Sequence, residues 1–180
     1  QTDPTVALAA LMIPLGTYLS DILRPKYISI TDLALLAQLV EALKSEILED
    51  ITKKTENALA LEPALRRIMS DVQERLIFRA QTYVKDQVGN YRATADDLDF
   101  PAKLVRALQA KSKGDDVEDD ITNWYPPLER TLTCLSKLYR SVEVKTFAGL
   151  AQEVVSLCAD NIAGAAQTVS TKATPVDGQL

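Results

Sequence analysis

Two long rows of apolar residues recur at the spacing of an α-helix, and this feature restricts the possible folds more than any other. The first row steps by three or four residues through Leu33, Leu36, Val40, Leu43, Ile47 and Ile51. The second row contains Leu65, Met69, Val72, Leu76, Ala80, Tyr83 and Gln87 or Val88. Because one helical turn takes 3.6 residues, each row lies on one face of a helix several turns long. Both faces need a neighbouring helix to cover them.

The composition also favours helices. The chain has 180 residues, of which 47% are apolar and only six are Gly, and its apolar content is led by Leu and Ala. Leu and Ala are strong helix formers, whereas strands favour clusters of Val, Ile, Thr and aromatic residues. The sequence therefore predicts an all-α fold, an elongated bundle of five or six helices that forms a section of a rod.

Capping residues and prolines predict where the first three helices begin and end. The first helix is expected to start at Asp3 and Pro4 and to end near Arg24, ahead of Pro25. A short connector, KYISI, then leads to Thr31, which is predicted to cap the helix of the first apolar row. Glu62 and Pro63 are expected to open the third helix, and Gly89 and Asn90 to end it.

The last part of the chain predicts two more helices. Pro126 and Pro127 suit a first helical turn, because their missing amide protons would be unpaired there. The expected seam of the helix that follows is Leu128, Leu132, Leu135, Tyr139 and Val142, with Cys134 as a small buried filler. The final helix carries Phe147, Leu150, Val154, Leu157, Ile162, Ala165 and Val169. These two helices are predicted to form an antiparallel hairpin.

An acidic segment separates these parts. Residues 93–120 hold eight acidic and four basic residues, or −4 of the net charge of −5 of the whole chain. Such a polar run has too little apolar surface to pack. The predicted organisation is a helical bundle section over residues 1–110, an acidic flexible linker over 111–123 and a helical hairpin over 124–180 that continues the same rod.

The residue inventory excludes most catalytic chemistry. The chain has no His, and its two cysteines, Cys134 and Cys158, form no metal-ligand spacing. Its six glycines are scattered, so no phosphate-binding loop is assembled. The apolar opening DPTVALAALMIPLGTYL is too short and too broken for a transmembrane helix or a signal peptide. We expect no catalytic, cofactor-binding or metal-binding residue.

Carboxylates are the remaining chemical alternative. Asp96, Asp97 and Asp99 form one acidic cluster, and a second one contains Asp115, Asp116, Glu118, Asp119 and Asp120. Either cluster offers oxygen ligands for a hard cation, but neither has the alternating spacing and central Gly of a calcium loop. The favoured interpretation is a solvated linker face rather than a metal site or a carboxylate enzyme.

Two groups of residues are candidates for partner binding. The third helix carries Arg66, Arg67, Arg75 and Arg79, which suit an acidic partner helix or anionic lipid, although interleaved acids favour an ordinary solvated face. Trp124 and Tyr125 are the second group. They fit either an interface hot spot or, as the preferred interpretation, an apolar staple that packs on the first turns of the next helix.

Three stretches carry a family resemblance in a fixed order. They are LGTYLSDILRPKYI at 15–28, DVQERLIFRAQTYVKDQVGNY with DDLDFPAKL at 71–91 and 96–104, and WYPPLERTLTCLSKLYR at 124–140. Together with a variable acidic insert, they resemble the family formed by the third subunit of the conserved oligomeric Golgi complex. The resemblance covers nearly the whole chain and implies that it is an internal fragment, without the family's amino-terminal coiled coil.

The resemblance also implies a function. The complex is a multisubunit tether on the cytosolic face of Golgi membranes, acts in retrograde transport within the Golgi, and works with SNAREs, small GTPases and golgins. Its subunits resemble those of other tethers, which are non-catalytic rods of helical bundles without cofactors. The expected role is a helical scaffold for other subunits. The alternative is a stand-alone module that recognises a small GTPase or a SNARE helix through the helix at 62–92.

Overall fold

The computed structural model describes residues 4–53, 56–99, 102, 103, 105 and 124–172 of the chain. Every regular element in these residues is helical, which confirms the predicted all-α class. The elements are α1 (Pro4–Ser29), α2 (Leu33–Lys53), α3 (Glu56–Val84), α5 (Pro126–Leu138) and α6 (Val144–Lys172), with a π-helical turn, η1 (Lys85–Gly89), directly after α3. The five α-helices of the described part agree with the expected five or six.

The chain divides into two compact units. The first unit contains Gln1–Ala80 and Lys137–Val144, and the second contains Gln81–Ser136 and Lys145–Leu180. The residue ranges of the predicted bundle, linker and hairpin stay a prediction, because most of the linker lies outside the described residues. The predicted rod also stays a prediction.

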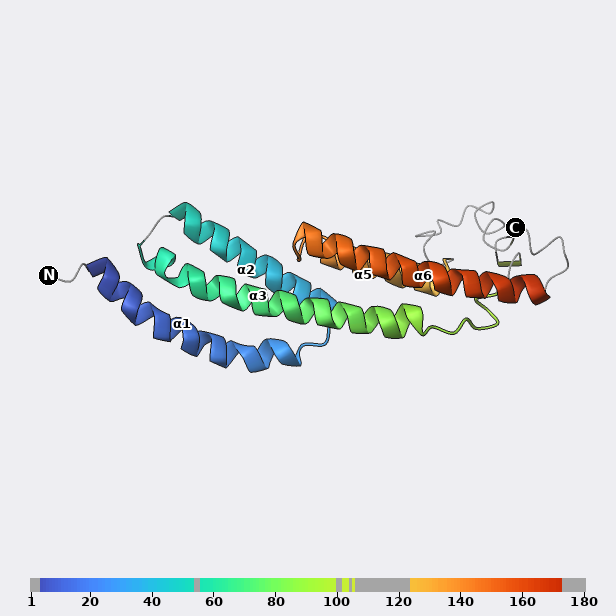
Figure 1. Ribbon diagram of the computed structural model, residues 1–180, viewed down its shortest axis with the longest axis horizontal. Coiled ribbons are helices and arrows are strands. Elements are labelled where there is room, and N and C mark those ends of the chain that lie inside the picture. Colours follow the sequence, from blue (N-terminus) through green and yellow to red (C-terminus); the bar gives the residue numbers. More distant parts are fainter. Residues whose placement is uncertain (1–3, 54–55, 100–101, 104, 106–123, 173–180) are drawn as a thin grey trace. The chain divides into compact units, whose positions relative to one another are not determined.

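The first unit is built from α1, α2 and most of α3, which run in alternating directions (Figure 1). The predicted row on α2 is confirmed at Leu33, Leu36, Val40 and Ile47, which are buried, whereas Leu43 is only half-buried. Side chains from α2 and α3 also hold the turn at 137–144. Lys44 donates a hydrogen bond from Nζ to the carbonyl oxygen of Arg140, and Gln73 donates one from Nε2 to that of Ser141, at 2.7 Å.

The first helix is longer than predicted. α1 does not end at Arg24 but continues through Pro25 to Ser29, so the expected KYISI connector is largely helical. A proline inside a helix costs about 3 kcal/mol. Burial of Tyr27, which is only 4% exposed and donates a hydrogen bond to Asp71 of α3 at 3.0 Å, offsets part of this cost. A tertiary contact thus overrides the local stop signal.

Two further helix starts differ from the prediction. The cap of α2 is Asp32 rather than Thr31, since the Asp32 carboxylate accepts a hydrogen bond from the Ala34 amide at 2.7 Å. α3 begins at Glu56 and not at Glu62, so Pro63 lies inside the helix. The end of this helical stretch at Gly89 and Asn90 is confirmed, with η1 as its last turn.

The buried row of α3 keeps a constant spacing of four residues. Its members are Ile68, Val72, Leu76, Ala80, Val84 and, in η1, Val88. Val72, Leu76, Ala80 and Val88 were predicted. Leu65, Met69 and Tyr83 are only half-buried, and of the alternatives Gln87 and Val88 the buried one is Val88.

The second unit contains the end of α3, η1, the segment 91–99, and nearly all of α5 and α6. A tight turn joins α5 to α6, with hydrogen bonds from the amides of Ser141 and Val142 to the carbonyl oxygen of Leu138. The predicted hairpin is confirmed. On α6, Leu150, Val154 and Cys158 are buried, whereas Ile162, predicted as a core residue, is 38% exposed.

The predicted seam of α5 is confirmed at Val142, which is 6% exposed, but its other members lie one residue off the buried face. The buried positions are Pro127, Thr131, Cys134, Leu138 and, in the turn after the helix, Ser141. Leu132 and Tyr139 are instead 45% and 65% exposed, because one residue corresponds to a rotation of about 100° around the helix. The prediction followed the largest apolar side chains, but the helix turns its smaller ones inward. Cys134 is a small buried filler as predicted.

Thr131 is buried with an unused hydroxyl, and replacing it with Val is expected to stabilise the chain. The residue is 2% exposed, and its Oγ1 has no hydrogen-bond partner among the described residues. Val has the same shape without the polar atom, so Thr131→Val should gain about 1 kcal/mol, or about 2–4 °C in melting temperature. Thr133→Val, at an exposed site of the same helix, is the control and should stay within about 0.5 kcal/mol. A lower melting temperature for Thr131→Val would mean that the hydroxyl has a partner.

Candidate interaction surfaces

The outer side of α1 carries an exposed apolar row, here called the α1 outer row. It consists of Leu11, Leu15, Tyr18 and Ile22, which are 71%, 53%, 65% and 48% exposed. Their spacing of four, three and four residues places them on one helical face. A contiguous set of large exposed apolar side chains is typical of a surface that another protein element covers.

The inner side of α1 uses small residues instead. A Cβ atom built on Gly16 would lie 2.6 Å from the Cβ atom of Ala64, so the backbone of α1 approaches α3 too closely for any side chain at this position. Ser20, one turn later, is also buried. Gly16 and Ser20 therefore face the core of the first unit, while the α1 outer row faces away.

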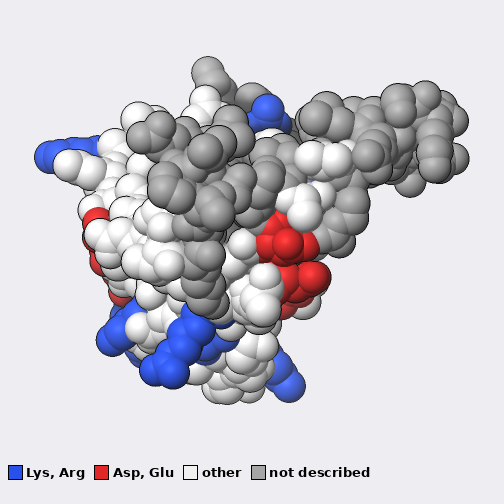
Figure 2. Space-filling view, turned by 90° about the vertical axis from the view of Figure 1, so that its right-hand side faces the viewer, with Lys and Arg blue, Asp and Glu red and all other residues white. Residues whose placement is uncertain are grey.

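The four candidate arginines of α3 do not form one surface. At 100° per residue, Arg66 and Arg75 point to opposite sides of the helix. Figure 2 likewise shows Lys and Arg side chains in separate groups on the face that it draws. The structure therefore does not gather the four arginines into one site.

Most of these arginines already have local contacts. Arg66 forms an ion pair with Glu62 at 2.6 Å, and Arg79 donates a hydrogen bond from Nη2 to the carbonyl oxygen of Thr31 at 3.4 Å. The guanidinium carbon of Arg75 lies 5.7 Å from the ring centre of Phe78. Arg67 is exposed and forms no ion pair with a described residue.

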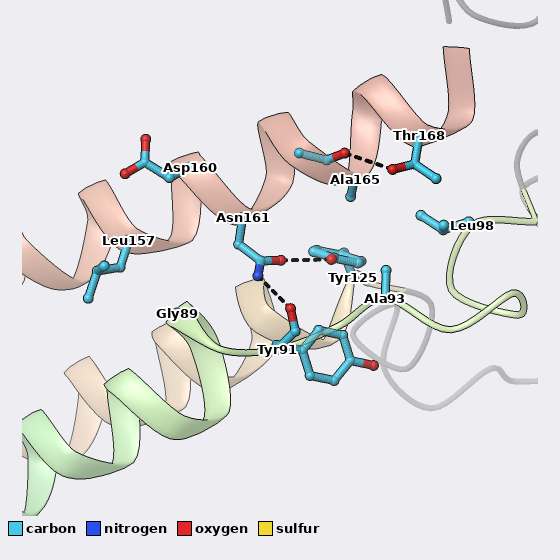
Figure 3. Close-up of a pocket in the computed structure, with 11 residues that line it drawn as sticks. Gly89, Tyr91, Ala93, Leu98, Tyr125, Leu157, Asp160, Asn161, Ala165 and Thr168 are labelled. Atoms are coloured by element: carbon cyan, nitrogen blue, oxygen red, sulfur yellow. Dashed lines mark hydrogen bonds between the residues drawn. The ribbon is translucent and has the colours of Figure 1, made fainter. Parts of the chain in front are cut away.

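The second unit is organised around one side chain, Asn161 of α6 (Figure 3). Its Nδ2 donates hydrogen bonds to the carbonyl oxygens of Val88 at 3.1 Å and Tyr91 at 2.9 Å. Its Oδ1 accepts a hydrogen bond from the hydroxyl of Tyr125 at 2.7 Å. Asn161 thus ties η1, the segment after it and the start of α5 to α6.

The two aromatic candidates have different environments. Trp124 is 38% exposed. Tyr125 is half-buried, and besides its bond to Asn161 its ring meets that of Tyr91 edge to face, with ring centres 6.0 Å apart. Burial raises the pKa of the Tyr125 hydroxyl. Tyr125 therefore contacts Tyr91 and Asn161, and its predicted packing on the first turns of α5 stays a prediction.

A second hydrogen-bond cluster holds the segment after η1. One oxygen of the Asp97 carboxylate accepts hydrogen bonds from the Tyr91 hydroxyl at 2.7 Å, the Thr94 amide at 2.8 Å and the Thr94 hydroxyl at 2.7 Å. Burial alone would raise the pKa of Asp97, but these hydrogen bonds and the nearby Lys103 outweigh it and lower the pKa. Asp97 thus acts as a structural acceptor at neutral pH.

The same cluster delays the ionisation of Tyr91. Burial, together with the hydrogen bond to Asp97 and the charge of its carboxylate, raises the pKa of Tyr91 from 10.0 to about 12. The folded state then holds the phenolic proton more tightly than the unfolded state does. The stability that this proton contributes is present below pH 10.0 and is lost as the pH rises through about 12.

A pH titration of tyrosinate absorbance tests this cluster. Removing the carboxylate charge in Asp97→Asn should move the late-titrating tyrosine toward its ordinary pKa, and Tyr91→Phe should remove this late component from the curve. Both variants would be compared with the parent chain at pH values where circular dichroism shows that all three are folded. An unchanged curve in Asp97→Asn would contradict the assignment.

A pocket of about 420 Å³ lies beside these residues in the second unit (Figure 3). It is lined by Gly89, Tyr91, Ala93, Leu98, Tyr125, Leu157, Asp160, Asn161, Gly164, Ala165 and Thr168. Of the residues that sequence reasoning singled out for partner binding, only Tyr125 reaches it. Asn161 was missed, although an amide inside the apolar row of α6 was a visible signal.

The described residues show neither a metal-ligand group nor a membrane-spanning helix. Within 4–53, 56–99, 102, 103, 105 and 124–172, no group of three or more Cys, Asp or Glu side chains is arranged to hold a metal ion. In the same ranges, no helix is long and apolar enough to cross a membrane. The second acidic cluster, Asp115–Asp120, lies outside the described residues.

Comparisons with known proteins give one consistent family. The sequence model described as "Conserved oligomeric Golgi complex subunit 3, C-terminal" matches residues 1–180. The chain is 37% identical to the protein named conserved oligomeric Golgi complex subunit 3 in Dictyostelium discoideum over 155 residues, which cover 78% of the chain and 17% of that protein. It is 32% identical to the protein of the same name in Homo sapiens, over a match that covers 99% of the chain and 27% of that protein.

The chain thus spans about a quarter or less of the length of these two relatives. A third relative of the same name, from Drosophila melanogaster, is 32% identical over 92% of the chain and 22% of that protein. No solved structure matches the chain.

Proposed function

Since the chain belongs to the family of conserved oligomeric Golgi complex subunit 3, C-terminal part, we propose that it is a non-catalytic helical scaffold within a Golgi vesicle-tethering complex. In this role it acts in retrograde transport within the Golgi, on the cytosolic face of the membranes. Its partners are the other subunits of the complex, and SNAREs, small GTPases and golgins are further partners by family resemblance. It needs no cofactor.

The α1 outer row carries this proposal. A scaffold built from helices needs apolar faces that another helix can cover, and four large side chains at helical spacing provide such a face. The close approach of α1 to α3 at Gly16 supports the same role, because it leaves the large side chains of α1 free for a second partner.

A double variant, Leu15→Asp with Tyr18→Asp, tests the proposal in the full-length subunit. Both residues are more than half exposed, so the variant should fold with a melting temperature close to that of the parent. It should no longer co-purify with the other subunits, because charges in the row oppose burial against a partner helix. Thr17→Asp, at an exposed site of the same helix, is the matched control and should co-purify normally. Normal co-purification of the double variant would refute the proposal.

A stand-alone module for a small GTPase or a SNARE helix is the second candidate. Arg67 and Arg75 favour it, because neither guanidinium group has a carboxylate partner among the described residues. Arg66 and Arg79, the other two candidate arginines of the same helix, already have local contacts with Glu62 and Thr31. In pull-downs, Arg67→Ala with Arg75→Ala should then lose the partner, whereas Arg66→Ala, whose guanidinium group is already paired with Glu62, should retain it.

A further inference from the structure

The pocket beside Asn161 is not explained by the scaffold role. It belongs entirely to the second unit, whereas the α1 outer row and the four arginines belong to the first. Its volume of about 420 Å³ is large enough for one bulky side chain and part of its backbone. Small residues, Gly89, Ala93, Gly164 and Ala165, make up much of its wall and leave this space open.

Apart from the Asp160 carboxylate, the polar side chains described above in the wall already have hydrogen-bond partners. Both hydrogen bonds of Asn161 Nδ2 go to backbone carbonyls, and its Oδ1 accepts from Tyr125. The Tyr91 hydroxyl donates to Asp97, and the Thr168 hydroxyl donates to the carbonyl oxygen of Gly164. The wall therefore combines polar groups that already have partners with the apolar side chains of Leu98, Leu157 and Ala165, and these can contact an apolar side chain.

The charged side chain in the lining of the pocket is acidic. Asp160 is the single charged residue of its lining, is exposed, and makes no hydrogen bond or ion pair with a described residue. Leu98, which also lines the pocket, sits on the turn that carries Asp97 and Asp99. Two cations of the same unit already have local interactions: Lys103 acts on Asp97, and Arg130 lies over the Tyr91 ring at 4.8 Å and donates a hydrogen bond to the Gln87 carbonyl oxygen at 3.2 Å.

We propose that this pocket is a docking site for a protein segment with one large apolar anchor residue and a Lys or Arg within one helical turn of it. The anchor fills the space between Tyr125, Leu98 and Ala165, and the basic residue pairs with Asp160 at the rim. Charge complementarity assigns the partner, because a basic segment gains from the carboxylates and an acidic one is repelled. This interaction does not depend on the α1 outer row.

Two synthetic helical peptides of equal length serve as probes. Each has one Leu anchor, flanked at helical spacing by Lys in the first peptide and by Glu in the second. Fluorescence anisotropy with the full-length subunit should show binding of the Lys peptide and not of the Glu peptide. Ala165→Phe, which fills the pocket, should abolish binding of the Lys peptide. Asp160→Lys should weaken it by about fivefold at low salt, since an exposed pair contributes up to about 1 kcal/mol.

Glu153→Lys is the matched control. Glu153 lies on the same helix and is also exposed, but it does not line the pocket. It should leave binding of the Lys peptide within about twofold of the parent, since it does not line the pocket. Thermal melts of all variants separate loss of binding from loss of folding.

Three outcomes would overturn the proposal: no binding of either peptide, equal binding of both, or binding that Ala165→Phe leaves unchanged. Self-association of the subunit that Ala165→Phe abolishes, without peptide binding, would assign the pocket to a second copy instead. Failure here would leave co-purification of the complex intact, so it can be told apart from failure of the scaffold proposal.

Discussion

A Leu76→Asp variant is expected to be largely unfolded at physiological temperature. Leu76 is 0% exposed in the buried row of α3. The change removes the burial of a Leu side chain, which contributes about 2 kcal/mol, and places a carboxylate without a partner in an apolar core, which costs several kcal/mol more. The sum, about 5 kcal/mol, is comparable with the whole stability of an ordinary domain. Thermal and urea unfolding followed by circular dichroism would measure the loss.

Leu35→Asp is the matched control. The same substitution is made in the same unit, on α2, but Leu35 is 53% exposed, so the new carboxylate stays hydrated. Its effect should remain within about 1 kcal/mol. A Leu76→Asp variant as stable as Leu35→Asp would show that α3 presents a different face to the core.

Asn161→Asp is expected to cost about 3 kcal/mol at neutral pH, which is about 6–12 °C in melting temperature. The amide Nδ2 group donates to the carbonyl oxygens of Val88 and Tyr91. A carboxylate would lose both hydrogen bonds and face two carbonyl oxygens with its own negative charge. The melting temperature should recover in part at low pH, because a protonated carboxyl group can again donate one hydrogen bond.

Gln152→Glu separates this effect from the change of net charge. Gln152 is an exposed amide on the same helix, and its conversion to an acid should leave the melting temperature nearly unchanged at every pH. If Asn161→Asp behaved like Gln152→Glu, Asn161 would have no structural role in the second unit.

The sequence predicted well what depends on one helix alone. The apolar row of α2 and the central part of the α3 row follow from 3.6 residues per turn, and the paired prolines at 126 and 127 marked the start of α5. These features need no knowledge of distant neighbours.

Other predictions failed where a contact between elements decided the outcome. Pro25 was expected to stop α1, but Tyr27 reaches Asp71 of α3 and the helix continues. On α5, the large residues Leu132 and Tyr139 were expected inside, but the helix packs through Thr131 and Cys134. In both cases local preference is worth only a few kcal/mol, so a favourable packing arrangement can override it.

The candidate site was the least predictable part. Tyr125 could be picked out as an aromatic residue before a helix, but Tyr91, Asp97 and Asn161 gain their importance from one another. The structural role of Asn161 depends on hydrogen bonds to the carbonyl groups of Val88 and Tyr91, some 70 residues away in the chain.

By itself, the sequence determined that this chain is helical, where most of its helices lie and which stretches match one family, since periodicity and composition act within a few turns of chain. Contacts between elements set which side chains of each helix are buried, that the α1 outer row faces away while Tyr27 packs inward, and that Asn161 and Leu98 line one pocket. The physical reason is that burial and hydrogen bonding depend on partners brought together by the fold, and a helical pattern fixes a direction on its own helix but not the neighbour it meets.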